Sequence, residues 1–247
     1  MSAVRHGASM VPDVDPLDRG LLLLSIAAAI AYFVTRPLQP FPGSVVIKAL
    51  GMAPLAVVGF RVLGRAEGAA PQEAGRGVPD SALLATALAL SCLGDVLLHL
   101  GFRRYFGAGL VAFFLAHLAY ILLFVRSWPR PLRPPRRQLM LAAAVLVYGV
   151  VVTVWLSSHL GGYAVPVIAY AIAITAMTVS AILAGFSTPL VWMGAMLFVL
   201  SDSLIAAGRF RAAVPLAAYL IWPTYYLGQY CITVGVLRAK AGDPSAG

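Results

Sequence analysis

Residues 91–98 read Ser-Cys-Leu-Gly-Asp-Val-Leu-Leu, and residues 198–205 read Phe-Val-Leu-Ser-Asp-Ser-Leu-Ile. Each stretch places one carboxylate, Asp95 or Asp202, inside an apolar run where its neighbours are small or apolar. A carboxylate in the hydrocarbon of a membrane is costly, so it usually marks a functional site. The chain has only nine acidic residues, and two of them in such similar settings indicate a shared role.

The composition is that of a membrane protein. The 247 residues are 61% hydrophobic and 11% charged, with a mean hydropathy of +0.88. A soluble domain needs more polar residues than this to cover its surface. The net charge of +9 lies mainly on arginines in loops, and no basic stripe alternates with aromatic residues, so we expect no nucleic-acid partner.

Eight apolar runs follow a polar segment, residues 1–19, that we expect to be disordered and cytoplasmic. The runs cover approximately residues 20–35, 44–62, 81–101, 107–125, 138–157, 163–184, 188–207 and 213–236. Most have the roughly 20 residues with which an α-helix crosses a bilayer, and they are too long for strands. The sequence therefore predicts an all-α, polytopic membrane protein: one domain of about eight helices over residues 20–236, then a cytoplasmic tail, 237–247.

The positive charges predict an orientation. Twelve of the 18 Lys and Arg residues fall in one set of alternate loops, five fall in the other set, and Lys48 lies inside a run. The positive-inside rule then places both termini in the cytoplasm, and we expect a bacterial inner membrane. With a rise of about 1.5 Å per residue, Asp95, Asp202 and Lys48 each lie roughly 20–22 Å from the cytoplasmic surface. Three ionisable residues at one depth predict a shared cavity.

The two acidic stretches also suggest an internal repeat. Gly94-Asp95-x-Leu97 with Gly101 aligns with Ser201-Asp202-x-Leu204 with Gly208. An even number of predicted helices separates the two copies, so the repeat would be parallel, with its axis along the membrane normal. Such an axis could bring Asp95 and Asp202 face to face. The alternative is chance similarity between helices rich in Leu and Ala.

Several other polar residues are candidates for binding substrate, and each has a structural alternative. The candidates are Lys48, His117, Tyr120, Ser201, Arg209, Tyr225, Tyr226 and Gln229. His117 could instead be a core histidine bonded to a neighbouring helix, and Tyr225, Tyr226 and Gln229 span two helix faces, so some of them would be packing residues. Arg209 could clamp a phosphate or merely snorkel to the interface.

Two intramembrane histidines and the two Asp residues could hold a metal ion, but the chain has no His-Glu-x-x-His motif and no Cys/His cluster. We therefore expect no metal and no organic cofactor. Cys92 and Cys231 lie in apolar runs, which favours packing over a disulfide.

Three groups of residues carry a resemblance to a known family. They are Gly94-Asp95 followed by Phe106-x-x-Gly109-Leu110-x-x-Phe113-x-x-Ala116-His117-x-x-Tyr120; Gly194-Ala195-x-x-Phe198-x-x-Ser201-Asp202-Ser203-Leu204 with Arg209-Phe210; and Thr224-Tyr225-Tyr226-x-x-Gln229. In order and spacing they resemble the YhhN-like lysoplasmalogenase family. Members carry Lys-Pro in the second helix, whereas Ala49 follows Lys48 here. The resemblance implies a lysophospholipid substrate in the membrane, whose vinyl ether bond is hydrolysed to a fatty aldehyde and glycerophospho-ethanolamine or -choline.

Two carboxyls suit that chemistry. A vinyl ether is hydrolysed by protonation of its β-carbon, which creates an oxocarbenium ion that water then attacks. The reaction needs one carboxylic acid and one carboxylate, the division of labour that glycosidases use. Burial and mutual repulsion of Asp95 and Asp202 favour that division, without indicating which residue is the acid. The alternatives are a small proton-coupled transporter, for which paired Asp residues and a repeat would also serve, and a non-catalytic lipid-binding protein. The sequence gives no signal for an oligomeric state.

Overall fold

The structure is a computed structural model that describes residues 14–69, 78–212 and 214–241, and these residues fold into helices without a strand. The α-helices are α1 (Pro16–Val34), α2 (Ser44–Ala69), α3 (Asp80–Arg126), α4 (Arg136–Ser157), α5 (Ala164–Leu183), α6 (Leu190–Phe210) and α7 (Ala217–Ala241). Two short 3-10 helices, η1 (Arg36–Leu38) and η2 (Gly161–Tyr163), lie between them. Six of the described helices are long and apolar enough to cross a membrane, which confirms the predicted all-α membrane class. The count of eight crossings and the internal repeat stay predictions.

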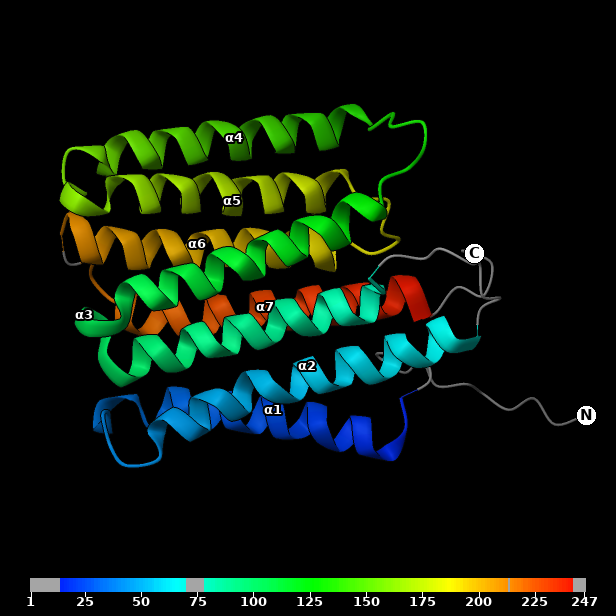
Figure 1. The fold of residues 1–247 in the computed structure, drawn as a ribbon, viewed down its shortest axis with the longest axis horizontal. Helices are drawn as coiled ribbons and strands as arrows, with labels where there is room; N and C mark the ends of the chain where they lie inside the picture. Colours follow the sequence, from blue (N-terminus) through cyan, green and yellow to red (C-terminus); the bar gives the residue numbers. More distant parts are fainter. Residues whose placement is uncertain (1–13, 70–77, 213, 242–247) are drawn as a thin grey trace, which may run out of the picture.

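Helix α3 contains two of the predicted apolar runs, residues 81–101 and 107–125. Its 47 residues would extend about 70 Å if it were straight, more than twice the thickness of hydrocarbon. The backbone leaves the helical conformation at Gly101, where φ is 176° and ψ is 89°. Figure 1 shows the result, two helical arms that fold back on each other. The first arm carries Asp95 and the second carries His117.

The ends of the bundle differ slightly from the predicted boundaries. Helix α1 begins at Pro16 rather than at residue 20, because the Asp15 carboxylate caps it by accepting a hydrogen bond from the Asp18 N–H at 2.8 Å. Helix α7 continues to Ala241 rather than ending at residue 236. The predicted disorder of residues 1–19 is therefore wrong for residues 16–19, which are helical, while residues 1–13 and the end of the predicted tail, 242–247, lie outside the described residues.

The helices pack in an order that differs from their order in the chain. Helix α2 contacts α1 and α3, helix α5 contacts α3, α4 and α6, and α7 contacts α6, α2 and α1. Large side chains that are fully buried fill the centre, among them Met52, Leu84, Phe198 and Ile232. Helix α4 lies at one side of the bundle, against α5, with many of its large apolar side chains exposed (Figure 1). The exposed apolar face of α4 suits contact with lipid.

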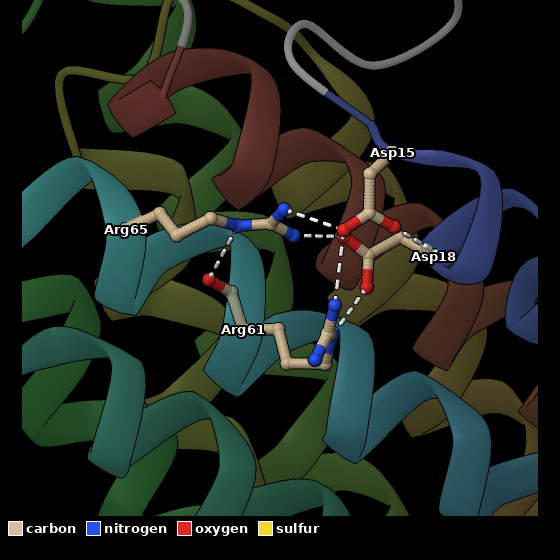
Figure 2. A network of polar contacts seen from close by, with 4 residues as sticks. All are labelled: Asp15, Asp18, Arg61 and Arg65. Atoms are coloured by element: carbon tan, nitrogen blue, oxygen red, sulfur yellow. Dashed lines mark hydrogen bonds and ion pairs between the residues drawn. The ribbon is translucent and has the colours of Figure 1, made fainter.

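Ion pairs gather at the end of the bundle where α1 begins and α7 ends. Figure 2 shows Asp15 and Asp18 beside Arg61 and Arg65 of α2, with Arg61 Nε 2.7 Å from Asp18 Oδ1 and Arg65 Nη1 2.9 Å from Asp15 Oδ2. At the same end, Asp80 pairs with Lys240 of α7 at 2.5 Å and with Arg126 at 3.2 Å. The start of α1 and the end of α7 therefore lie on one side, as the orientation rule predicted; that this side is cytoplasmic stays a prediction (Figure 1).

Candidate active site

Asp95 is a buried carboxylate with a cation as its partner. Lys48 of α2 places its Nζ 2.8 Å from Asp95 Oδ1, and both side chains are largely shielded from solvent. The ammonium also lies over the rings of Tyr32 and Trp222, 5.7 and 5.5 Å from their centroids. Aromatic faces and a carboxylate together stabilise a cation that would otherwise be costly at this depth.

The second oxygen of Asp95 is available for chemistry. Asp95 Oδ2 and the Tyr225 hydroxyl of α7 are both buried, and neither has an aligned hydrogen-bond partner among the described residues. The two groups lie close enough to interact electrostatically. The Tyr225 hydroxyl is therefore a second neighbour of the Asp95 carboxylate, whose ion pair with Lys48 is formed by Oδ1.

Asp202 lies in a different environment. The Tyr170 hydroxyl of α5 donates a hydrogen bond to Asp202 Oδ2, and the carboxyl also interacts electrostatically with Asp95. No Lys or Arg forms an ion pair with Asp202 within residues 14–69, 78–212 and 214–241. The two carboxyls thus differ in their partners, because one faces an ammonium and the other a phenol.

Both carboxyls line one cavity, which we call the polar cavity, as the depth argument predicted. It has a volume of about 500 Å³, counted to its open mouth. Helices α1, α2, α3, α6 and α7 contribute to its wall. Its polar lining residues are Tyr32, Arg36, Lys48, Asp95, Ser201, Asp202 and Tyr225. Ser201 holds α6 to α7 there by donating a hydrogen bond to the Ile221 carbonyl at 3.1 Å.

A second cavity, which we call the apolar cavity, adjoins the first. It has a volume of about 780 Å³ counted to its opening, and it lies between the second arm of α3 and helices α4, α5 and α6. Its wall is almost wholly aliphatic or aromatic. Four residues line both cavities: Leu98, Phe113, Asp202 and Ile205. Asp202 is the carboxyl that reaches both, so it lies where the polar surface meets the apolar one.

Five of the ten predicted site residues line the polar cavity, namely Lys48, Asp95, Ser201, Asp202 and Tyr225. The others lie behind its wall. His117 is fully buried; its Nδ1 bonds to the Phe113 carbonyl and its ring packs edge-on against Tyr170 and Phe198. The Tyr120 hydroxyl donates to Gln229 Oε1 at 2.5 Å, and Gln229 also interacts with Tyr225 in the cavity wall, although neither Tyr120 nor Gln229 lines the cavity itself.

The remaining two predicted binding residues, Tyr226 and Arg209, line neither cavity; the Arg209 Nε is buried without a hydrogen-bond partner among the described residues. The Tyr226 hydroxyl is 2.9 Å from Ser25 Oγ, which links α7 to α1. The Arg209 guanidinium lies among three aromatic rings, 5.2 Å from the centroid of Phe106, 5.5 Å from Phe210 and 5.8 Å from Tyr163. Arg209 lines neither of the two cavities.

Sequence reasoning missed four residues that form the site: Tyr32, Arg36, Tyr170 and Trp222. Tyr170 is a polar residue in the middle of an apolar run, which is a usable but weak signal. Trp222 precedes Pro223 in α7, and its Nε1 donates to the Ala29 carbonyl at 3.0 Å. Arg36 follows the end of α1 and looks like an ordinary loop arginine in the sequence. Only the packing of α1 against α2 and α7 brings it to the cavity mouth.

The described part of the chain contains no candidate metal centre. No three His, Cys, Asp or Glu side chains come together there in a way that could hold an ion. Of the two histidines considered as ligands, His117 bonds to a backbone carbonyl, and the ring of His99 bonds to Tyr32 at 3.0 Å and to Ser44 at 2.7 Å.

Comparison with known proteins identifies the family. The model of the YhhN family matches residues 43–236, which includes Lys48, both carboxyls and the whole of α3 to α6. The chain belongs to the YhhN family. The resemblance in the sequence motifs is thereby confirmed.

The curated relatives of this YhhN chain come from bacteria and mammals. The lysoplasmalogenase of Mycobacterium tuberculosis is 36% identical over 155 residues, 62% of this chain and 59% of the relative. Human lysoplasmalogenase TMEM86B is 34% identical over 157 residues, 64% of each chain. The pig protein of the same name is 33% identical over 166 residues, 67% of this chain and 68% of the relative. The chain spans about three fifths of the length of the mycobacterial relatives that it matches. No solved structure matches it significantly.

Proposed function

We propose that this protein hydrolyses the vinyl ether bond of lysoplasmalogens within the membrane, with Asp202 as the general acid and Asp95 as the carboxylate. The observation that carries the proposal is the position of Asp202 between a polar cavity that holds Asp95 and an apolar cavity of hydrocarbon-like lining. A lysoplasmalogen has the same division, because its vinyl ether joins a polar glycerophosphate to an aliphatic chain.

The environments of the two carboxyls support the assignment of roles. Asp95 has the ammonium of Lys48 at 2.8 Å, so we assign it the role of the carboxylate that stabilises a cation and accepts a proton from water. Asp202 borders the apolar cavity and forms no ion pair with a cation among the described residues, so we assign it the role of the acid, with the Tyr170 hydroxyl holding its Oδ2 in place. Buried carboxyls with unlike surroundings divide acid and base roles in other enzymes in this way.

The orientation of the substrate decides which of its carbon atoms each carboxyl meets. With the chain in the apolar cavity, the β-carbon is next to Asp202, which donates its proton to that carbon. The α-carbon, bonded to the ether oxygen, faces Asp95 and becomes the oxocarbenium centre. A water molecule adds there and loses its proton to Asp95. The hemiacetal then collapses: Asp95 donates its proton to the glycerol oxygen as the carbon–oxygen bond breaks, the Asp202 carboxylate accepts the hydroxyl proton, and the fatty aldehyde leaves. Both carboxyls thereby return to their starting states.

The relatives support the same reaction. The mycobacterial and mammalian proteins that this chain resembles are named lysoplasmalogenases. The chain covers only part of their length, so the activity is carried to this protein as part of the proposal.

The test is aldehyde release by the purified protein in detergent. The substrates are an alkenyl lysophospholipid and, as controls, its saturated-ether and ester analogues. We expect aldehyde from the alkenyl lipid alone. Asp95→Asn and Asp202→Asn should each lower kcat by at least about 100-fold, because each removes a group that transfers a proton or stabilises charge in the transition state.

Asp80→Asn is the matched control. Asp80 is the carboxylate at the start of α3; it pairs with Lys240 and Arg126 and lines neither cavity. It should keep the wild-type rate. Turnover retained in either Asp95→Asn or Asp202→Asn would contradict the acid–base assignment. Transport in sealed vesicles without aldehyde release in detergent would favour the transporter alternative.

A further inference from the structure

The polar cavity holds a second cation, Arg36, that neither the sequence motifs nor the proposed chemistry uses. Arg36 begins η1, directly after α1, and it lines the cavity beside Tyr32 and Trp222. It lies before residue 43, where the match to the YhhN family model begins. Whatever Arg36 does is therefore a property of this chain that the family match does not supply.

Arg36 has no counter-ion among the residues that the structure describes. Its Nε is buried without a hydrogen-bond partner, and none of the ion pairs among the described residues includes it. The other cation of the cavity, Lys48, is already neutralised by Asp95 at 2.8 Å. A guanidinium in a cavity wall that has no counter-ion among the described residues suits an anion, and its planar fork matches phosphate oxygens.

The local structure holds Arg36 in place. The turn after α1 is closed by the Gln39 side-chain amide, which donates to the Tyr32 carbonyl at 2.9 Å. The Tyr32 ring packs against Trp222 with centroids 4.6 Å apart, and its hydroxyl bonds to His99 at 3.0 Å. These contacts connect Tyr32, in the last turn of α1, to α3 and α7. Arg36 is therefore presented by a braced segment rather than by a free loop.

We propose that Arg36 binds the phosphate of the lysolipid and so fixes the direction in which the substrate lies. The phosphate occupies the mouth of the polar cavity, the glycerol passes Lys48 and Asp95, and the aliphatic chain continues past Asp202 into the apolar cavity. This inference rests on the proposed function for the identity of the lipid. It replaces Arg209, the phosphate clamp that the sequence suggested, because the Arg209 guanidinium is enclosed by aromatic rings and lines neither cavity.

The experiment compares binding of two ligands that the reaction does not cleave. One is a saturated 1-O-alkyl lysophospholipid, and the other is the 1-O-alkylglycerol with the same chain but no phosphate. We expect the wild-type protein in detergent to bind the phosphorylated ligand roughly 10- to 100-fold more tightly. Arg36→Gln should lose that preference while its Kd for the alkylglycerol stays within about threefold. Arg36→Lys should keep part of the preference, because it keeps the charge but loses the fork.

Arg104→Gln is the matched control, since Arg104 is an exposed arginine in the α3 turn that contacts Tyr105 and lines neither cavity. It should keep the preference for phosphate. An unchanged preference in Arg36→Gln would overturn the inference, and so would its loss in Arg209→Gln instead. Inorganic phosphate is the third probe. Binding as tight as that of the lysolipid, and equally dependent on Arg36, would mean a free-anion site and would also overturn the assigned direction.

Hydrolysis separates this inference from the proposed function. If aldehyde is released, Arg36→Gln should raise KM for the alkenyl lysophospholipid roughly 10-fold or more with kcat within about threefold, since phosphate binding is shared by ground and transition states. Aldehyde release with a wild-type KM in Arg36→Gln would overturn the inference and leave the function standing. Phosphate-dependent binding through Arg36 without any aldehyde release would overturn the proposed function and leave the Arg36 anion site standing.

Discussion

At the scale of single residues, Lys48 and Asp95 show how two charged side chains can be buried in the interior of a membrane protein. Each side chain would be costly alone in a low-dielectric interior, and each offsets the cost of the other at 2.8 Å. The aromatic faces of Tyr32 and Trp222 complete the surroundings of the ammonium. The pair therefore contributes to stability as well as to the proposed chemistry, and the two contributions can be measured separately.

The first prediction concerns this coupling. Lys48→Met should lower the free energy of unfolding by about 3–5 kcal/mol, because it leaves Asp95 as an unpaired buried charge. Lys48→Met combined with Asp95→Asn should lose less than Lys48→Met alone, since the second change removes that charge. The measurement is the thermal midpoint of the wild type, both single variants and the double variant in one detergent. Additive losses in the double variant would show that the two side chains are not coupled.

Lys240→Met provides the comparison for an ion pair at the periphery. Lys240 Nζ is 2.5 Å from Asp80, with both side chains more than a fifth exposed. Its loss should cost no more than about 1 kcal/mol, because solvent screens such pairs.

At the scale of elements, α6 and α7 pack closely through glycine, and these two helices carry Asp202 and Tyr225 of the polar cavity. A Cβ built on Gly194 would lie 2.5 Å from the Gly228 carbonyl oxygen, and one built on Gly228 would lie 2.8 Å from the Gly194 oxygen. These contacts are with backbone, which cannot give way as a flexible side chain can. The two helices would have to separate.

Gly194→Ala should therefore destabilise the protein by roughly 1–3 kcal/mol and reduce aldehyde release more than proportionally to the folded fraction. Gly208→Ala on the same helix is the control, because a Cβ there has no atom within 4 Å. The measurements are the thermal midpoint and the kcat of aldehyde release for Gly194→Ala and Gly208→Ala. Equal behaviour of the two variants would mean that close approach at Gly194 does not set the site geometry.

The α1–α2 ion-pair cluster holds the helix that precedes Arg36. The pKa of Asp15 is lowered because the Asp18 N–H donates to its carboxylate and Arg65 and Arg61 lie nearby. Its contribution to stability is present above its ordinary pKa of 3.8 and is lost as the pH falls through the lowered value in the folded protein. The thermal midpoint should therefore fall as the pH drops below about 4, and it should fall less in Asp15→Asn. A parallel pH dependence in wild type and variant would contradict this linkage.

At the scale of the whole molecule, the bundle has a charged end and a cavity end. The ion pairs of Asp15, Asp18 and Asp80 lie where α1 begins and α7 ends (Figure 1, Figure 2). Arg36, at the mouth of the polar cavity, follows the other end of α1. If the charged end is cytoplasmic, as the positive-inside rule predicts, a lysolipid reaches the site from the outer half of the membrane.

Cysteine labelling tests that orientation. Leu132→Cys lies in the exposed connection between α3 and α4, and Ser158→Cys lies in the exposed connection between α4 and α5. With Cys92 and Cys231 replaced by Ala, a membrane-impermeant maleimide applied to intact cells should label position 158 at once and position 132 only after permeabilisation. The reverse pattern would invert the predicted topology.

The sequence by itself determined the class of the protein, and it predicted one common depth for the two carboxyls. Continuous apolar runs of about 20 residues exclude other folds, and a fixed rise per residue converts position in a run into depth. Asp95, Asp202 and Lys48 could be placed at one level for that reason. The family motifs added the expected chemistry.

Only the tertiary structure decided which residues face the cavities. A run that is apolar on all sides carries no periodic signal for its rotation, so His117, Tyr120 and Gln229 looked as suitable as Tyr225 until packing turned them behind the wall. Arg36 is the opposite case: nothing near it in the sequence marks a site, and the contact of α1 with α2 and α7 brings it to the cavity mouth. The depth of a residue in the membrane follows from its position in the apolar run, whereas the direction of its side chain depends on which helices become neighbours.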